Sequence, residues 1–328
     1  MGTKNIFERI RENISEMTGS AQEHQRLIEL VNQMENKQVN LLIAGPTGSG
    51  KSSTINSLFN MSVAKVGVGV DPQTKDIDRY ELENLIIWDT PGFGDSEAAD
   101  KEYSRQIASK LEETDEDGKK LIDIVLVVLD ASSKDMGTSY KLISKTILPH
   151  LDTQKGQRIL IAINQADMAM KGNHWNYNQN CPDEILKKFL EDKVSSIQSR
   201  ILESTGLQID PIYYCAGYTD DNGEQRRAYN LNKLLLQILH EVGSEKVLIF
   251  ADNINNDENM WVDDDGDGNY SESIAQSFGD VFKDSIGDGF ETGGVVDGMI
   301  AGIPGAIIGM LVGAVGGGIC GLFKGLFA

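Results

Sequence analysis

The segment from Gly45 to Ser52 has the residue types and spacing that can hold nucleotide phosphates. It reads Gly45, Pro46, Thr47, Gly48, Ser49, Gly50, Lys51 and Ser52, with Ser53 after it, and fits the pattern G-x-x-x-x-G-K-[ST]. The glycines let backbone N–H groups point at phosphate oxygens, and the start of a following helix favours negative charge. We expect Lys51 to reach the β- and γ-phosphates and Ser52 to ligate Mg²⁺.

A second segment offers a metal ligand beside this loop. The apolar run 85–88 predicts a strand, and Asp89, Thr90, Pro91 and Gly92 follow it directly. A carboxylate at the carboxyl end of a strand lies at the sheet edge where the phosphate loop is expected. We therefore predict that Asp89 holds Mg²⁺, directly or through water, and that Gly92 offers its N–H to the γ-phosphate.

A third segment indicates which base is bound. A buried strand over 159–163 ends in Asn164, Gln165, Ala166 and Asp167. A carboxylate here can accept hydrogen bonds from N1 and N2 of guanine, whereas adenine has no donors at those positions. Leaving such groups unpaired costs a few kcal/mol, so Asp167 predicts guanine specificity.

Apolar runs alternate with amphipathic stretches around these segments, which predicts an α/β fold. We expect a three-layer domain with a mostly parallel six-stranded sheet and helices on both faces. The strands are expected at 39–44, 78–82, 85–88, 122–129, 158–163 and 211–215. The helices are expected at 51–60, 98–114, 139–147, 182–204 and 231–241.

Taken together and in order, these motifs resemble those of the Era-like P-loop GTPases of the translation-factor class, especially the small bacterial YfjP-type GTPases. The resemblance covers about residues 38–243. It implies that Asn164 and Asp167 match the base-reading Asn-Lys-x-Asp motif, with Gln165 in place of the lysine whose stem lies over the base. It further implies GTP and GDP as ligands, with Mg²⁺ as the cofactor.

The resemblance also implies two further sites. Cys215, Ala216 and Gly217 match the Ser-Ala-Lys loop whose backbone supports the guanine carbonyl, although only Ala216 is retained. Thr74 is the candidate for the switch threonine that binds Mg²⁺ in the GTP state; the alternative is an ordinary loop threonine. Lys51, Thr74 and Gly92 are then the expected catalytic residues.

Two positions predict slow hydrolysis. Ras-type enzymes orient the attacking water with a Gln after the glycine that corresponds to Gly92, and here that position is Phe93. Some relatives instead hold a potassium ion with an Asn of the phosphate loop, and here that position is Gly48. Our hypothesis is that hydrolysis is completed in trans by a second copy or an activating protein, with Asp95 as a nearby polar candidate.

An acidic loop follows the main domain. Asp263, Asp265 and Asp267, then Gly268, match the first half of a calcium-binding loop, D-x-D-x-D-G. The twelfth position of such a loop requires Glu, and here it is Ile274. Calcium binding and a solvated acidic linker are therefore the two alternatives.

The C-terminal stretch combines glycines with large aliphatic residues. From Gly298 to Phe323 there are 26 uncharged residues, long enough to cross a bilayer. Glycines at every fourth position, from Gly305 to Gly325, share one stripe of a helix, where backbones can approach closely. A glycine-zipper membrane segment and a helix docked on the protein's own main domain are the two interpretations.

Four zones follow from these patterns. We expect an N-terminal helical arm over 1–36, which either packs on the main domain or binds a partner, and a GTPase domain over 37–245. An acidic linker or loop-rich appendage is expected over 246–290, and a hydrophobic helical tail over 291–328.

Composition restricts the partners and the compartment. Acidic residues outnumber basic ones by 50 to 30, and the resulting net charge of −20 counts against nucleic-acid binding. Three widely spaced cysteines and an N-terminus without an apolar signal core predict a cytoplasmic protein, with the tail allowing a position at the inner face of the membrane.

The leading functional prediction is a molecular switch that binds GTP, hydrolyses it slowly and couples its state to membrane association. The first alternative is a ribosome- or RNA-associated assembly GTPase, as several Era-like proteins are. The second is a stress or defence effector whose tail permeabilises membranes.

Overall fold

The computed structural model describes residues 5–16, 20–59, 76–134, 136–151, 158–219, 225–251, 253–262, 264–274 and 276–277. Thr74, Asp263 and the uncharged stretch 298–323 lie outside these residues, so the structure does not bear on the predictions made for them.

Six strands form the central sheet, in the order β2-β3-β1-β4-β5-β8. Five of them are parallel, and β2 pairs antiparallel with β3 at one edge. The central strands are buried along their length, as expected for apolar runs covered on both faces. The predicted six-stranded, mostly parallel sheet is confirmed. The bounds are β1 Val39–Ala44, β2 Asp78–Leu82, β3 Leu85–Asp89, β4 Ile124–Asp130, β5 Ile159–Asn164 and β8 Ile212–Tyr213.

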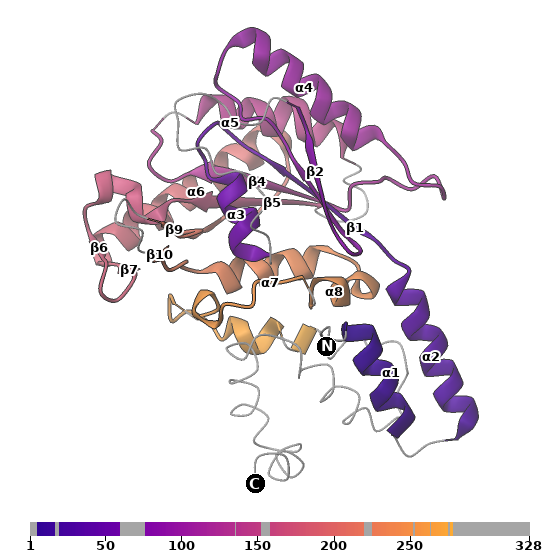
Figure 1. The fold of residues 1–328 in the computed structure, drawn as a ribbon. Coiled ribbons are helices and arrows are strands. Elements are labelled where there is room, and N and C mark those ends of the chain that lie inside the picture. Colours follow the sequence, from indigo (N-terminus) through magenta and orange to yellow (C-terminus); the bar gives the residue numbers. More distant parts are fainter. Residues whose placement is uncertain are drawn as a thin grey trace.

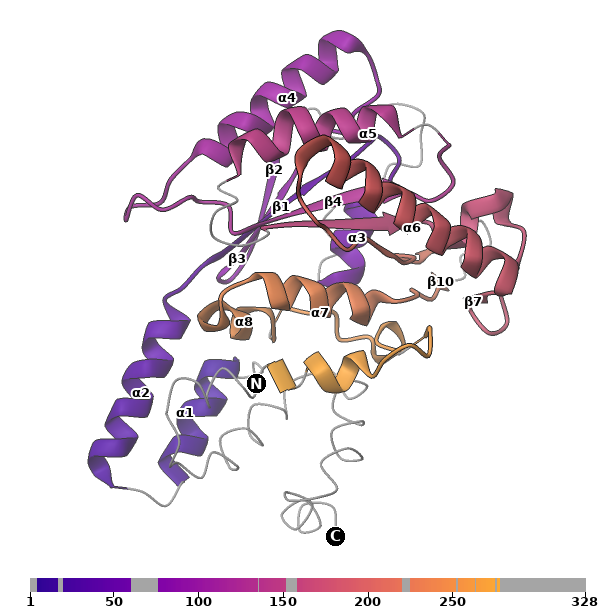
Figure 2. The same cartoon turned by 180° about the vertical axis from the view of Figure 1, so that it is seen from behind.

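Helices cover both faces of this sheet, which gives the three layers visible in Figures 1 and 2. One face packs against α4 (Glu97–Glu112), α5 (Gly137–Lys141) with its π-helical continuation (Leu142–Ile147), and α6 (Glu184–Thr205). The other face packs against α3 (Lys51–Leu58), α7 (Leu231–Glu241) and α8 (Ser244–Ala251).

Local signals explain where several of these elements begin and end. Ser96 caps α4 by accepting a hydrogen bond from the backbone N–H of Ala99. Asp183 caps α6 in the same way, and Gly206 ends that helix in the left-handed conformation. The last strand is shorter than predicted because Cys215 leaves the sheet and exchanges two backbone hydrogen bonds with Tyr229.

The N-terminal helices α1 (Ile6–Glu16) and α2 (Ala21–Glu35) form an antiparallel pair beside α8 (Figure 1). Their apolar faces are buried in the same core cluster as the sheet residues. Asn84, in the turn between β2 and β3, donates a hydrogen bond to the backbone oxygen of Glu35. The arm therefore packs on the main domain, the first of its two predicted roles.

The segment after α8 is a packed appendage rather than a linker. Trp261 and Ile274 are buried in the core cluster that holds α7 and α8. Asn255 donates its backbone N–H to Leu58, at the end of the helix that begins at the phosphate loop. A 3₁₀ turn, Glu258–Met260, lies between these contacts. Although the segment is acidic overall, it contains a few large apolar residues. Their side chains are buried in the core and hold the segment in place.

Candidate functional site

The phosphate loop joins β1 to α3 and requires glycine at two of its turns. Gly50 has φ 87° at the residue that precedes α3, a left-handed conformation that side chains disfavour. A Cβ atom on Gly45 would lie 2.1 Å from the backbone oxygen of Val128 on the neighbouring strand. The sequence pattern predicted this loop, and close backbone packing against β4 explains one of its glycines.

Lys51 lies at the centre of the loop. Its Nζ atom donates hydrogen bonds to the backbone oxygens of Gly45, at 3.2 Å, and Pro46, at 3.1 Å. Burial lowers the pKa of Lys51 to about 8, while the charges of Asp89 and Asp95 oppose this shift. A buried ammonium group is stabilised further by an anion, which is the role a nucleotide phosphate fulfils.

The two predicted metal ligands, Ser52 and Asp89, lie beside each other. The Ser52 hydroxyl donates a hydrogen bond of 2.9 Å to Asp89 Oδ2, while Asp89 Oδ1 is buried and has no hydrogen-bond partner. Burial raises the pKa of Asp89 to about 6 against the opposing charge of Lys51. An orphaned carboxylate oxygen beside a hydroxyl suits a hard cation with oxygen ligands, so these residues fit Mg²⁺. The metal would neutralise phosphate charge there.

The segment after β3 runs along the phosphate loop. Thr47 donates its backbone N–H to the oxygen of Phe93 at 2.8 Å, and Phe93 donates to the oxygen of Gly45 at 3.3 Å. A Cβ atom on Gly92 would lie 2.4 Å from Thr47 Oγ1. Only glycine permits this approach, which places the backbone of Gly92 at the phosphate loop as predicted.

Asn164 connects the phosphate loop to the predicted base-binding loop. Its Nδ2 donates to the backbone oxygen of Ser49 at 3.0 Å, and its Oδ1 accepts the backbone N–H of Ala216 at 2.9 Å. Gln165 Nε2 donates to the backbone oxygen of Gly48 at 2.7 Å. These bonds bring together three sequence segments that lie far apart in the chain, and they enclose one cavity.

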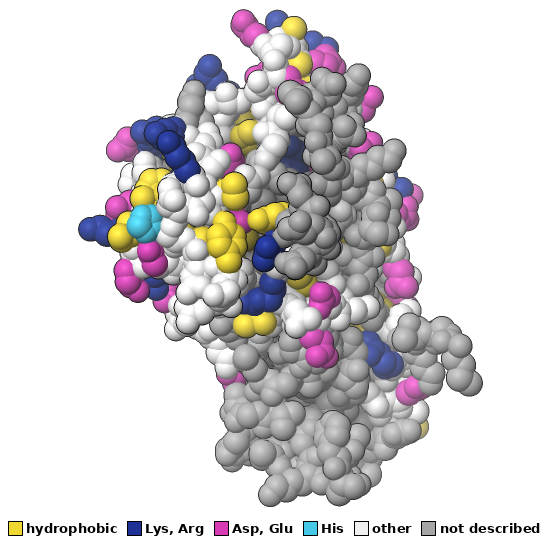
Figure 3. All heavy atoms as spheres, turned by 60° about the vertical axis from the view of Figure 1, so that its left-hand side comes forward, with side chains coloured by type: hydrophobic (Ala, Val, Ile, Leu, Met, Phe, Trp, Pro, Cys, Tyr) yellow, Lys and Arg dark blue, Asp and Glu magenta, His cyan; other side chains and the backbone are white. Residues whose placement is uncertain are grey.

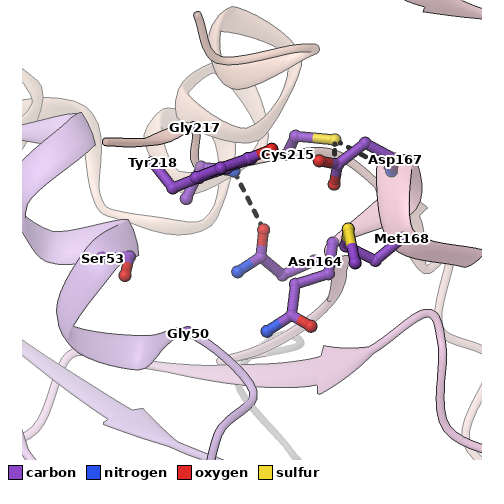
Figure 4. A pocket seen from close by; sticks show the side chains of 10 residues that line it. Gly50, Ser53, Asn164, Asp167, Met168, Cys215, Gly217 and Tyr218 are labelled. Carbon is purple, nitrogen blue, oxygen red and sulfur yellow. Dashed lines mark hydrogen bonds between the residues drawn. The ribbon is translucent and has the colours of Figure 1, made fainter. Parts of the chain in front are cut away.

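That cavity has a volume of about 320 Å³, and its walls carry the predicted base-reading residues (Figure 4). Asp167 is 8% exposed at the cavity wall, and burial raises its pKa. Cys215 donates its thiol to Asp167 Oδ1 at 3.2 Å and accepts the backbone N–H of Asp167 at 3.3 Å. The lining residues are Gly50, Ser53, Asn164, Gln165, Asp167, Met168, Cys215, Ala216, Gly217 and Tyr218.

Sequence reasoning missed two residues of this wall, Met168 and Tyr218. Both are more than two-fifths exposed although they are large and apolar or aromatic. Each directly follows a motif residue, Asp167 or Gly217, and that adjacency was the available signal. Figure 3 shows hydrophobic side chains gathered on the face that carries this end of the molecule. Such a wall can contact the faces of a planar base.

The acidic loop has partners other than a metal ion. Asp265 lies 2.7 Å from Lys233 and accepts a hydrogen bond from Tyr270, and Asp267 lies 3.4 Å from Lys187. In the described part of the chain, no group of three or more His, Cys, Asp or Glu side chains could hold a metal ion. The calcium prediction therefore gains no support, because lysine side chains neutralise the charges of Asp265 and Asp267.

Membrane insertion also gains no support from the described elements. None of the helices that the structure describes combines the length and apolar character needed to span a bilayer.

Asn164 holds the loop with the phosphate-binding pattern against the loop with the predicted guanine-reading residues, so the two predicted parts of a nucleotide site are fixed to each other. The part of the chain around this site is therefore similar to a P-loop GTPase domain. Residues 40–165 match the sequence family described as 50S ribosome-binding GTPase. The predicted resemblance to the Era-like and YfjP-type GTPases is confirmed.

Similar proteins match only part of their length. The uncharacterized protein YfjP of Escherichia coli strain K12 is 28% identical over 149 residues, 44% of this chain and 47% of YfjP. YkfA of the same organism is 28% identical over 152 residues, with the same coverage. Interferon-gamma-inducible GTPase 10 of Mus musculus is 30% identical over 93 residues, 25% of this chain and 22% of that protein. The chain therefore spans about half the length of YfjP and YkfA.

Solved structures match more weakly. Era in complex with MgGDPNP and a segment of 16S ribosomal RNA is 20% identical, with a TM-score of 0.42, covering 63% of this chain and 57% of that chain. Toc33 from Arabidopsis thaliana in complex with GDP and Mg²⁺ is also 20% identical, with a TM-score of 0.41, covering 66% and 90%. At this level of similarity they bear on neither substrate nor partner.

Proposed function

We propose that this protein is a GTP-binding switch that uses Mg²⁺ and hydrolyses GTP to GDP and phosphate at a low intrinsic rate. The observation that carries the proposal is that Asn164 bonds to both the phosphate loop and Ala216. Asp89 acts on Lys51 on one side of this connection, and Asp167 lines the cavity on the other side. The lysine and the aspartate suit phosphates and Mg²⁺, and the second carboxylate suits guanine.

The slow rate follows from what stands at the water-orienting position. Phe93 cannot hydrogen-bond through its side chain, and its ring is buried against Tyr103 with 6.2 Å between centroids. A GTPase without a well-placed water-orienting group depends on other residues or on a second protein for efficient turnover.

Guanine specificity gives the direct test. Wild-type protein is titrated calorimetrically with GDP, ADP and xanthosine diphosphate in the presence of Mg²⁺. We expect binding of GDP and none of ADP at the same concentrations. In Asp167→Asn the side chain can donate a hydrogen bond, so preference shifts from guanine to xanthine, whose C2 carries an oxygen. Asp192→Asn, an exposed substitution on α6, removes the same charge and should leave GDP binding unchanged. Equal binding of ADP and GDP by wild type would refute the proposal.

Membrane coupling is the second part of the proposal and rests on the sequence of residues 298–323 alone. With it we propose a cytoplasmic protein that contacts the inner face of the membrane. Liposome flotation of the full chain and of a chain ending at residue 290, each with GTP or GDP, tests this part. Flotation that requires the tail supports it, and equal recovery of both proteins in the bottom fraction contradicts it.

Ribosome association is the competing function, and the description of the matching family favours it. The net charge of −20 opposes it, because ribosomal RNA repels an acidic protein. Co-sedimentation with ribosomal subunits, in the presence of GTP and at two salt concentrations, separates the two functions: GTP-dependent pelleting with large subunits would favour the ribosomal one.

A further inference from the structure

One polar side chain of the segment that follows β3 is bonded to the phosphate loop. The hydroxyl of Thr47 donates a hydrogen bond of 2.9 Å to Asp95 Oδ1. The charge of Asp95 also acts on Lys51, where it opposes the lowering of the lysine pKa that burial causes. The carboxylate of Asp95 therefore acts on Thr47 of the phosphate loop and on the amine of Lys51, which is expected to contact the γ-phosphate.

The other side chains of this segment have different roles. Thr90 is fully buried, and the ring of Phe93 packs into the core. Ser96 caps α4, and Asp100 accepts the backbone N–H of Gly94 at 2.8 Å. Within described residues 90–100, Asp95 is thus the side chain that the structure holds against the phosphate loop.

Gly94 explains how the chain brings Asp95 to this place. Its φ of 104° lies in the region that favours glycine, so the residue between the buried Phe93 and the exposed Asp95 is one that adopts this conformation readily. The exposed Asp95 side chain then returns to the loop at Thr47.

We propose that Asp95 is a catalytic residue that accepts a hydrogen bond from the water attacking GTP, and that Thr47 is its positioning residue. This inference rests on the proposed function. The water oxygen forms a bond to the γ-phosphorus, and the bond from that phosphorus to the β–γ bridging oxygen breaks. The bridging oxygen keeps the electron pair and leaves with GDP. The water proton passes to Asp95 and then to the released phosphate.

A carboxylate in this role carries a cost that an amide does not. Its negative charge repels the γ-phosphate, and this repulsion weakens only where Lys51 and Mg²⁺ compensate it. Catalysis by Asp95 is therefore compatible with a low turnover number.

The test compares wild type with Asp95→Ala in single-turnover hydrolysis, at protein concentrations low enough to keep the chains monomeric. We expect the hydrolysis rate to fall about 100-fold, the lower range for a general acid–base group. GDP affinity should change less than about twofold, because GDP lacks the γ-phosphate. Binding of aluminium fluoride to the GDP complex, which mimics the transferring phosphoryl group, should be lost.

Glu97→Gln is the matched control. Glu97 is exposed in the first turn of α4 and carries the same charge two residues away, so its removal should leave the rate within about twofold. Thr47→Ser keeps the hydroxyl and should keep the rate. Thr47→Val should slow hydrolysis less than Asp95→Ala does, and adding Thr47→Val to Asp95→Ala should cause no further loss, since without the carboxylate the threonine has nothing to position.

The outcomes separate this inference from the proposed function. An unchanged rate and retained aluminium fluoride binding in Asp95→Ala overturn the role of Asp95 alone. A faster rate in Asp95→Ala also overturns it and shows that the carboxylate acts only by repulsion. Absence of GTP binding by the wild-type protein overturns the proposed function instead.

Discussion

Cys215 shows how much of a binding site depends on one side chain. The family resemblance implied that this position contributes backbone to the guanine site, and the structure adds that its thiol contacts Asp167, the carboxylate predicted to read the base. Burial raises the pKa of the Cys215 thiol well above its ordinary value, so the group keeps its proton and remains a donor. The thiol fixes one carboxylate oxygen and thereby orients the other.

Substitutions at Cys215 test this orientation. Cys215→Ser retains a donor, and GDP affinity should stay within about threefold of wild type. Cys215→Val removes the donor from a charged acceptor, and affinity should fall about tenfold, the equivalent of about 1.4 kcal/mol. Calorimetric titration with GDP and with inosine diphosphate, which lacks the 2-amino group, measures both. The loss should be larger for GDP; an equal loss would indicate a general packing defect.

We expect Asp89 to make Mg²⁺ binding depend on pH. Its pKa is raised to about 6, so the carboxylate is ionised at neutral pH and protonated as the pH falls through 6. Protons then compete with the metal, and the contribution of Mg²⁺ to GDP affinity should decrease about tenfold between pH 8 and pH 5. GDP titrations with and without Mg²⁺ measure it. The Asp89→Asn variant is the control, because its GDP affinity changes with pH only through titration of the phosphates. If the effect of Mg²⁺ depended on pH equally in Asp89→Asn and in wild type, the prediction would be contradicted.

At the scale of elements, the acidic loop connects the appendage to α7 and α6. The side chain of Asp265 is fully buried against Lys233, whereas Asp267 is half-exposed and its contact with Lys187 is longer. Both aspartates belong to one sequence pattern, and only the neighbouring helices distinguish them.

This difference predicts unequal effects of two similar substitutions. Asp265→Ala leaves the ammonium group of Lys233 without its buried partner and should lower the free energy of unfolding by about 3 kcal/mol. Asp267→Ala removes an exposed pair and should change it by less than about 0.5 kcal/mol. Urea denaturation with and without Ca²⁺ measures both. Equal effects, or stabilisation of wild type by Ca²⁺, would contradict the assignment of Asp265 to a salt bridge.

At the scale of the whole molecule, the core extends beyond residues 37–245, the part that the motifs predicted as the GTPase domain. The arm α1–α2 and the appendage bury apolar residues in the same cluster as α7 and α8. The ring centroids of Phe59, at the end of α3, and Phe250, in α8, are 6.2 Å apart. Changes at the phosphate loop and changes in the appendage therefore act on one continuous packed body.

Trp261 tests whether the appendage is part of this body. Its ring is 1% exposed, and its indole N–H donates to the backbone oxygen of Asn255. Trp261→Ala should lower the free energy of unfolding by about 3–5 kcal/mol because a large cavity forms. Its neighbour Val262 is 36% exposed, and Val262→Ala should cost much less. Chemical denaturation followed by circular dichroism measures both, and a small effect of Trp261→Ala would mean that the appendage folds separately.

The alternation of apolar runs was enough to predict the six-stranded sheet, and the motifs were enough to predict that Asp89 lies beside the phosphate loop and that Asp167 lies close to Asn164. These features are local: glycine conformations, strand ends and side-chain chemistry depend on a few adjacent residues. The loop residues 45–50 lie between β1 and α3, which begins at Lys51, as the sequence pattern predicted.

Only the tertiary structure decided which distant groups meet. The contacts of Cys215 with Asp167, of Asp95 with Thr47 and of Asp265 with Lys233 join residues 48, 48 and 32 positions apart. Composition left a linker and a loop-rich appendage as alternatives for the segment after α8, and the burial of Trp261 decided for the appendage. Packing depends on the whole arrangement of helices around the sheet, and no short sequence window contains that information.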